Sequence, residues 1–297
     1  MDNESLAGHE LLVISTRTGE TEVFSVNPGT GDARNLSRHP GSNERYAAWS
    51  PDGSMASFTS DRDGAYNLYL MNADGGNVRQ LTREPAPMIA GMQSWTADGR
   101  WIYFGLFGGP DPLMCRIASD GGSVEIVGQG IDPAISPDGT MLAFARALPG
   151  GHCLFRMDAD GGNVRQLTTR ENRFAGVHCT WMPDGSGILY SDLCGESLEL
   201  FRCNPEGGSV TQLTAFGNGT ASTSAAVSAD MRWISLRVSG EIFWRDAAAS
   251  ERAYREKRAD LRPVWVMGIN GENPRLVETL RFQVSIDGSR ACWRPSC

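Results

Sequence analysis

A turn ending in Asp-Gly recurs along the chain and constrains its fold more than any other feature. Its six copies, some of them degenerate, are Ser50-Pro51-Asp52-Gly53, Thr96-Ala97-Asp98-Gly99, Ser136-Pro137-Asp138-Gly139, Met182-Pro183-Asp184-Gly185, Ser228-Ala229-Asp230-Met231 and Ser285-Ile286-Asp287-Gly288. The aspartates are spaced by 46, 40, 46, 46 and 57 residues. Pro fixes its own φ and Gly after Asp tolerates positive φ, so each copy predicts a tight turn between two strands.

A second turn, typically Asp-Gly-Gly, alternates with the first. It recurs at Gly29-Thr30-Gly31, Asp74-Gly75-Gly76, Asp120-Gly121-Gly122, Asp160-Gly161-Gly162, Glu206-Gly207-Gly208 and Asn270-Gly271-Glu272, and the run GGNVRQLT occurs twice, at Gly75–Thr82 and Gly161–Thr168. One unit, Ala48–Thr82, reads as four short strands. A period of roughly 40–50 residues with four strands per unit predicts a β-propeller, and six copies of each turn predict six blades.

The phase of the repeats predicts that the two ends of the chain close the ring. The chain enters in mid-unit, with Leu11–Thr16 expected as a second strand, Glu22–Val26 as a third and Ala33–Ser37 as a fourth. Arg281–Ser285 is expected to supply the missing inner strand, although Ala291–Trp293 also reads as a second strand and competes with Leu11–Thr16. Such closure removes open sheet edges.

We therefore predict an all-β fold, a single six-bladed propeller domain over residues 1–297, with four-stranded antiparallel blades closed by N- and C-terminal strands. The last repeat carries a long insertion at about 241–262, rich in Ala and in charges of both signs, which predicts a partly helical segment. A solvated charged helix is the simpler interpretation of this segment, and a functional loop is the alternative.

Composition excludes several classes of function. The net charge of −8 argues against nucleic-acid binding and against docking on anionic membranes. No apolar run is long enough to span a bilayer, and the first residues lack a basic region before their short apolar run. Seven cysteines without CxxC spacing favour a reducing compartment. We expect a cytoplasmic protein; the alternative is a periplasmic one from which a signal peptide was removed.

The repeat (W/F)SPDG…FxSxRxG…(I/L)Y…DGGxxxxLT resembles the WD-like repeat of the bacterial TolB-like propellers. The resemblance covers nearly the whole chain and is clearest in the second and fourth repeats, while Thr96-Ala97, Ser228-Ala229 and Met231 depart from the pattern. It implies six blades. Members include periplasmic TolB, the propeller domains of prolyl oligopeptidases and oligogalacturonate lyases. No GxSxG motif is present, and the repeats begin by about Leu11, so we expect a bare propeller.

Residues entering each inner strand should line the mouth of the central channel. Taking Trp49, Trp95, Ile135, Trp181, Val227 and Val284 as equivalent, the residues three positions earlier are Tyr46, Met92, Asp132, His178, Ser224 and Arg281, and Gln93 lies one step further in. These are the predicted binding residues. No metal site is predicted, because one His at the mouth is a poor ligand set, although His39 and His152 on the same face leave a divalent cation at the funnel open.

Two functions remain open. The first is a non-enzymatic, monomeric interaction module that binds a protein segment or small ligand at the funnel face, without a cofactor. The second is a carbohydrate lyase acting on uronic-acid oligosaccharides, in which Arg281 binds the carboxylate and His178 or Tyr46 accepts a proton. The absence of a catalytic motif favours the first, and a polar channel mouth without any specific role is a further alternative.

Overall fold

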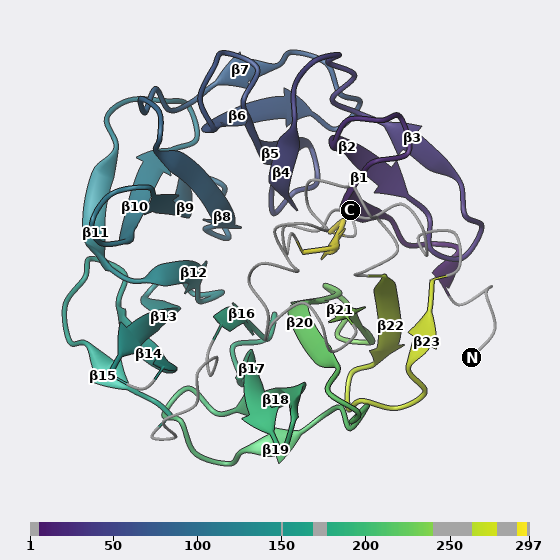
Figure 1. Ribbon diagram of the computed structural model, residues 1–297, viewed down its shortest axis with the longest axis vertical. Helices are drawn as coiled ribbons and strands as arrows, with labels where there is room; N and C mark the ends of the chain where they lie inside the picture. Colours follow the sequence, from purple (N-terminus) through teal and green to yellow (C-terminus); the bar gives the residue numbers. More distant parts are fainter. Residues whose placement is uncertain (1–5, 150, 169–176, 240–262, 278–289, 296–297) are drawn as a thin grey trace.

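The computed structural model describes residues 6–149, 151–168, 177–239, 263–277 and 290–295. In this part of the chain every regular element is a β-strand apart from one short turn near the N-terminus, and no helix is long and apolar enough to cross a bilayer. Figure 1 shows the sheets arranged around a central axis, with one edge strand of each sheet nearest the centre. The expected all-β architecture of four-stranded antiparallel sheets is confirmed.

The strands follow the predicted repeat closely. The first half of the chain contains β1 (Leu11–Ser15), β2 (Glu22–Val26), β3 (Ala33–Asn35), β4 (Glu44–Trp49), β5 (Met55–Ser60), β6 (Asn67–Asn72), β7 (Arg79–Gln80), β8 (Ile89–Trp95), β9 (Trp101–Phe107), β10 (Leu113–Ala118), β11 (Glu125–Gln129), β12 (Ile131–Ile135) and β13 (Met141–Leu148). The second half contains β14 (Gly151–Asp158), β15 (Arg165–Gln166), β16 (Val177–Trp181), β17 (Ile188–Cys194), β18 (Ser197–Cys203), β19 (Thr211–Gln212), β20 (Ala221–Val227), β21 (Trp233–Ser239), β22 (Val264–Gly268), β23 (Arg275–Leu276) and β24 (Cys292–Trp293).

Hydrogen bonding groups these strands in fours. Three sheets run β4-β5-β6-β7, β8-β9-β10-β11 and β12-β13-β14-β15. The strands β16 to β19 and β20 to β23 form two further antiparallel groups, joined into one sheet by a single parallel pair, Leu198 with Ala221. The last sheet has the order β24-β1-β2-β3 and so combines the two ends of the chain.

The position of β24 corrects the sequence analysis. Cys292 and Trp293 pair with Leu12 and Leu11 on the side of β1 away from β2, which is the inner place in that sheet. Ala291–Trp293 therefore does not compete with Leu11–Thr16 as a second strand. The expected inner strand Arg281–Ser285 and the insertion at 241–262 lie outside the described residues. The sequence explains why β24 takes the inner place. Trp293-Arg294-Pro295 repeats the pattern of Trp49-Ser50-Pro51 at the end of the inner strand β4, with Arg in place of Ser.

The apolar core lies between neighbouring sheets. One buried cluster joins Leu12 and Ile14 of β1 to Trp49 and Phe58 of the next sheet, and other clusters repeat this arrangement around the ring. The indole of Trp181 donates to the carbonyl of Ala134 in the preceding sheet at 2.9 Å. These tryptophans stabilise contacts between sheets, as their equivalent positions in the repeat suggest.

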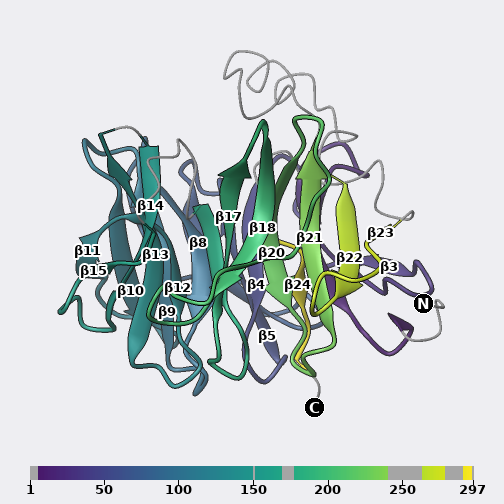
Figure 2. The ribbon, with the colours of Figure 1, turned by 90° about the horizontal axis from the view of Figure 1, so that it is seen from below.

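The Asp-Gly turns carry the chemistry that their sequence predicts. In the β4–β5 turn, Oδ1 of Asp52 accepts hydrogen bonds from the Ser50 hydroxyl at 2.6 Å and the Ser54 amide at 3.0 Å. Gly53 and its counterparts have positive φ, which an L-residue adopts at a cost. Figure 2 shows the ring from the side. Arg294, directly after β24, donates to the carbonyl of Gly53, so the β4–β5 turn lies beside the end of β24, on what we term the C-terminal face.

Candidate functional site

A bulge of the same kind interrupts five inner strands. In each bulge, two residues of the inner strand lie opposite a single residue of its partner strand. In β4, for example, Arg45 pairs with Thr59 and Ala48 pairs with Ser57. The same shift occurs in β8, β12, β16 and β20. The first of the two bulged residues has positive φ in every case. These residues are Tyr46 (49°), Met92 (58°), Asp132 (56°), His178 (62°) and Ser224 (56°).

These conformations are unusual for the residues that adopt them. Bulges of this type normally place Gly in the left-handed region, because a Cβ there costs roughly 1–2 kcal/mol. Such strain persists only where the surrounding structure fixes it, and it is concentrated at functional sites. All five are residues that the sequence analysis placed at the channel mouth, and four of them, Tyr46, Met92, Asp132 and His178, line a recess in the channel.

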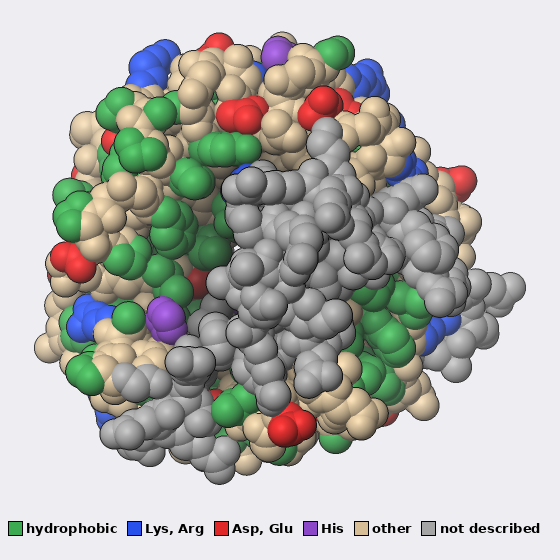
Figure 3. All heavy atoms as spheres, in the orientation of Figure 1, with side chains coloured by type: hydrophobic (Ala, Val, Ile, Leu, Met, Phe, Trp, Pro, Cys, Tyr) green, Lys and Arg blue, Asp and Glu red, His purple; other side chains and the backbone are tan. Residues whose placement is uncertain are grey.

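A recess in the central channel gathers side chains from several sheets. It is lined by Tyr46, Ala47, Met92, Gln93, Asp132, His178, Arg290 and Cys292, and its empty volume, including open solvent, is about 270 Å³. The lining comes from β4, β8, β12, β16, β24 and the segment leading into β24. Figure 3 shows a hollow near the centre of one face, beside β8 and β12, with apolar side chains along its described edge.

An ion pair crosses the recess. Nη2 of Arg290 lies 2.6 Å from Oδ1 of Asp132 and also donates to the carbonyl of Cys179 at 2.6 Å. The Asp132 side chain is 1% exposed and that of Arg290 13%. Burial is the largest single influence on the pKa of Arg290 and lowers it, but Asp132 together with the neighbouring Cys179 and Cys292 outweighs burial, and the pKa is raised. The guanidinium of Arg290 therefore lies directly against the carboxylate of Asp132 in the wall of the recess.

Three buried atoms of the recess lack a hydrogen-bond partner among the described residues: Oε1 of Gln93, Oδ2 of Asp132 and Nε of Arg290. The amide of Gln93 is oriented by its other end, since Nε2 donates to the Thr59 hydroxyl at 3.1 Å. Nδ1 of His178 lies 3.6 Å from Oδ2 of Asp132, too far for a good hydrogen bond. Two acceptors and one donor are thus left unsatisfied, which is costly unless water or a ligand completes them.

The predicted site residues are mostly brought together. Tyr46, Met92, Gln93, Asp132 and His178 all line the recess. Ser224 is buried on β20 and is not part of the lining, and Arg281 lies outside the described residues.

Arg290 is the residue that sequence reasoning missed. It stands three positions before Trp293, as Tyr46 stands before Trp49, and so occupies the place in the repeat that was assigned to Arg281. The Trp-Arg-Pro tripeptide at residues 293–295 was the signal that could have revealed it. The sequence analysis counted back from the turn Ser285–Gly288 and therefore took Val284, rather than Trp293, as the equivalent of Trp49.

The histidines outside the recess do not build a metal site. Nδ1 of His39 lies 3.1 Å from the Ser42 hydroxyl, and neither His39 nor His152 lines the recess. Over the described ranges, no three His, Cys, Asp or Glu side chains are grouped so that they could hold a metal ion.

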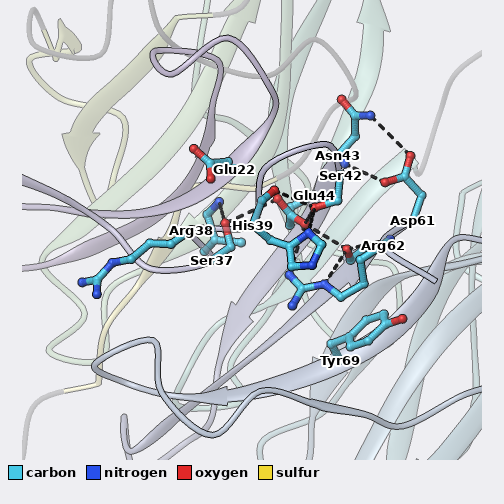
Figure 4. Close-up of polar contacts among 12 residues, drawn as sticks. Glu22, Ser37, Arg38, His39, Ser42, Asn43, Glu44, Asp61, Arg62 and Tyr69 are labelled. Carbon is cyan, nitrogen blue, oxygen red and sulfur yellow. Dashed lines mark hydrogen bonds and ion pairs between the residues drawn. The ribbon is translucent and has the colours of Figure 1, made fainter. Parts of the chain in front are cut away.

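A second buried polar cluster surrounds Glu44 at the start of β4. Its fully buried carboxylate accepts hydrogen bonds from Ser42 at 2.6 Å, Ser60 at 2.9 Å and Arg62 at 3.2 Å, and Figure 4 shows Ser42 and Arg62 directed toward it. Burial raises the pKa of Glu44, opposed by these donors. The guanidinium of Arg62 also stacks on Tyr69. Because its donors are mutually satisfied, the cluster is best explained as a structural anchor.

The sheets ranged about a central channel define a β-propeller. Residues 5–106 match the family model described as the TolB beta propeller domain. Together with the relatives below, this match confirms the resemblance to TolB-like propellers that the repeat predicts.

Curated relatives align with parts of the chain. The Tol-Pal system protein TolB of Anaeromyxobacter dehalogenans is 38% identical over 79 residues, covering 27% of this chain and 18% of that protein. TolB of Desulfosudis oleivorans is 29% identical over 118 residues, covering 39% of this chain and 26% of that protein. An uncharacterized protein of Agrobacterium fabrum is 29% identical over 167 residues, covering 50% of this chain and 54% of that protein. The chain thus spans between about a fifth and about half of the length of these relatives.

Solved structures share the fold over nearly the whole chain. A TolB-type protein of Agrobacterium tumefaciens superposes with a TM-score of 0.70 at 18% identity, covering 97% of this chain and 98% of that one. TolB of Acinetobacter baumannii superposes with a TM-score of 0.69 at 18% identity, covering 97% of this chain and 66% of that one. An oligogalacturonate lyase in complex with manganese superposes with a TM-score of 0.55 at 14% identity, covering 90% of this chain and 72% of that one. At these identities the likeness establishes the fold alone.

Proposed function

We propose that this chain is a non-catalytic interaction module that binds a partner protein at the funnel face and takes one polar group of that partner into the recess. The observation that carries the proposal is the set of unsatisfied atoms from three separate segments: Gln93 Oε1, Asp132 Oδ2 and Arg290 Nε. A carboxamide or peptide group, with donors and an acceptor, complements them. A charged group does not, because Asp132 and Arg290 already neutralise each other.

The wall of the recess supports a protein ligand. Tyr46 and Met92 provide an aromatic and a flexible apolar surface beside the polar atoms, and such mixtures are typical of interface hot spots. The Tol-Pal name of the relatives is consistent with a role in a protein assembly.

The binding test compares immobilised wild-type protein with two variants in an extract of the source cells. Tyr46→Ala combined with Gln93→Ala should lose a partner that the wild type retains. Ile126→Ala, which removes a 66% exposed side chain on the outer strand β11, should retain it. Equal recovery by the recess variant, or no partner on the wild type, would rule the proposal out.

A lyase acting on uronic-acid oligosaccharides is the second candidate, and His178 beside Asp132 is the observation that favours it, as an acid–base pair. With Arg281 outside the described residues, Arg290 would have to bind the substrate carboxylate, and it is engaged by Asp132. Absorbance from an unsaturated uronide product, measured with and without divalent metal, tests this. Turnover that disappears in His178→Ala would favour the lyase over the binding module.

We further infer that the chain forms one domain of six blades, monomeric in solution, whose ring closes through β24 and β1. Six groups of four strands in the described part of the chain, and the pairing of Leu11 with Trp293, support the number of blades and the closure. The compartment stays a prediction: the cysteines favour the cytoplasm, and the likeness to Tol-Pal proteins favours the periplasmic alternative.

A further inference from the structure

A cleft opens between two neighbouring turns on the C-terminal face, away from the recess. Its walls are the β4–β5 turn, with Ser50 and Asp52, and the β8–β9 turn, with Asp98, and Trp95 lies between them. The empty volume, open solvent included, is about 520 Å³. Trp95 is half-buried, whereas the equivalent tryptophans 49, 181 and 293 are each 6% exposed.

The neighbouring cleft, over Trp49, shows why its tryptophan is covered. The guanidinium of Arg294 stacks on Trp49, with its carbon 5.0 Å from the ring centre. Nη1 of Arg294 donates to Oε2 of Glu10 at 2.5 Å, and Nη2 donates to the carbonyl of Gly53 at 3.1 Å. This cleft is therefore filled by an arginine of the chain itself.

The two clefts are built in the same way. Trp293-Arg294-Pro295 and Trp49-Ser50-Pro51 occupy equivalent places in the repeat. A Cβ built on Gly53 would lie 3.6 Å from the carbonyl oxygen of Pro295, and one built on Gly99 would lie 3.7 Å from the ring of Pro51. Each turn thus packs against a proline residue of the preceding one, and the clefts differ at two places: Ser50 stands where the other has Arg294, and Met55 stands where the other has Glu10.

The cleft over Trp95 has the chemistry of a cation site. Ser50 is too short to reach across, and its hydroxyl is bound to Asp52. The Ser50 hydroxyl and the turn amide lower the pKa of Asp52 to about 2, and the Thr96 hydroxyl lowers that of Asp98. Both carboxylates are therefore ionised at neutral pH beside the half-buried indole of Trp95, an arrangement that attracts a guanidinium.

We propose that this cleft binds an arginine side chain of a partner protein, stacked on Trp95 as Arg294 stacks on Trp49, with Asp52 and Asp98 as the anions in place of Glu10. The site is independent of the recess and of the function proposed for it. An arginine is favoured over a lysine because a planar guanidinium can stack on Trp95 while it donates to the carboxylates on both sides.

The test uses the protein with 15N-labelled tryptophan and N-acetyl-arginine amide as the probe. The indole signal of Trp95, assigned by its loss in Trp95→Phe, should shift saturably. N-acetyl-citrulline amide has nearly the same shape without the charge and should bind at least roughly fivefold more weakly. An unchanged Trp95 signal in the folded wild type, or an equal response to citrulline, would overturn the proposal.

Two variants sharpen the result. Ser50→Arg supplies the residue found at Arg294 and should abolish the response by filling the cleft. Ser136→Arg makes the same change in the turn preceding Trp181, whose indole is already covered, and should leave the Trp95 response intact. Should Ser50→Arg fail to fold, Asp98→Asn, on an exposed side chain, is expected to weaken the probe roughly fivefold. Wild-type affinity in the folded Ser50→Arg or in Asp98→Asn contradicts the proposal.

Discussion

Arg290 and Asp132, separated by 158 residues, form a 2.6 Å ion pair across the central channel. Arg290 leads directly into β24, the strand that pairs with β1. The same guanidinium holds the carbonyl of Cys179 in the next sheet. The pair therefore fixes the C-terminal segment to two sheets on the far side of the ring, and it shapes the recess at the same time.

Breaking this pair should destabilise the protein strongly. Arg290→Gln leaves the carboxylate of Asp132 buried and unpaired, which costs about 3–5 kcal/mol in comparable cases. Arg116→Gln is the matched control, because its partner Glu125 is 45% exposed and such pairs contribute about 0–1 kcal/mol. Urea unfolding midpoints measure both. Similar losses in the two variants would show that Arg290 and Asp132 do not interact as described.

The strained bulges predict an inverted preference for glycine. At Ser224, with φ of 56°, Ser224→Gly should be more stable than Ser224→Ala by about 1 kcal/mol, since Ala carries a Cβ in the left-handed region. At Ser222, on the same strand but paired regularly with Val238, Gly should be less stable than Ala by roughly 0.5–1 kcal/mol. Thermal unfolding of the four variants gives the comparison, and the same sign at both positions would refute the strain.

The repeat predicted most of the fold because turn chemistry is local. Asp52, Gly53 and Pro51 determine their own turn, and copies at regular spacing determine the number and order of strands. The mouth residues followed by counting from Trp49 and its equivalents. The same counting failed at the C-terminus, where the turn at Asp287 is intact in sequence while the strand that pairs with β1 ends at Trp293.

The sequence could not predict contacts between residues that lie far apart in the chain. The pairing of Asp132 with Arg290 joins residues far apart in the chain, and nothing near either one marks it. The left-handed bulge at Tyr46 or Met92 violates local preference, because it is imposed by the neighbouring strand. Trp49 is covered by Arg294, which comes from the opposite end of the chain.

Glu44 predicts a pH dependence of one sign. Burial raises its pKa above the unfolded value of 4.5, so the folded state binds its proton more tightly. Its contribution to stability is complete below pH 4.5 and is lost as pH rises through the raised pKa of the folded state. The stability of wild type relative to Glu44→Gln should therefore fall across that window. Glu125→Gln, on an exposed carboxylate, is the control, and a flat difference for Glu44→Gln would contradict the burial effect.

Asp52 predicts the opposite sign at lower pH. Hydrogen bonds from Ser50 and Ser54 lower its pKa from 3.8 to about 2, so the folded state prefers the carboxylate. The stabilisation is present above pH 3.8 and is lost as pH falls toward about 2. Asp52→Asn should remove that acid-dependent loss, while Asp74→Asn in the following Asp-Gly-Gly turn should retain it. Unfolding by urea between these two pH values measures the slope, and an acid limb of equal steepness in wild type and Asp52→Asn would exclude the turn carboxylate as its source.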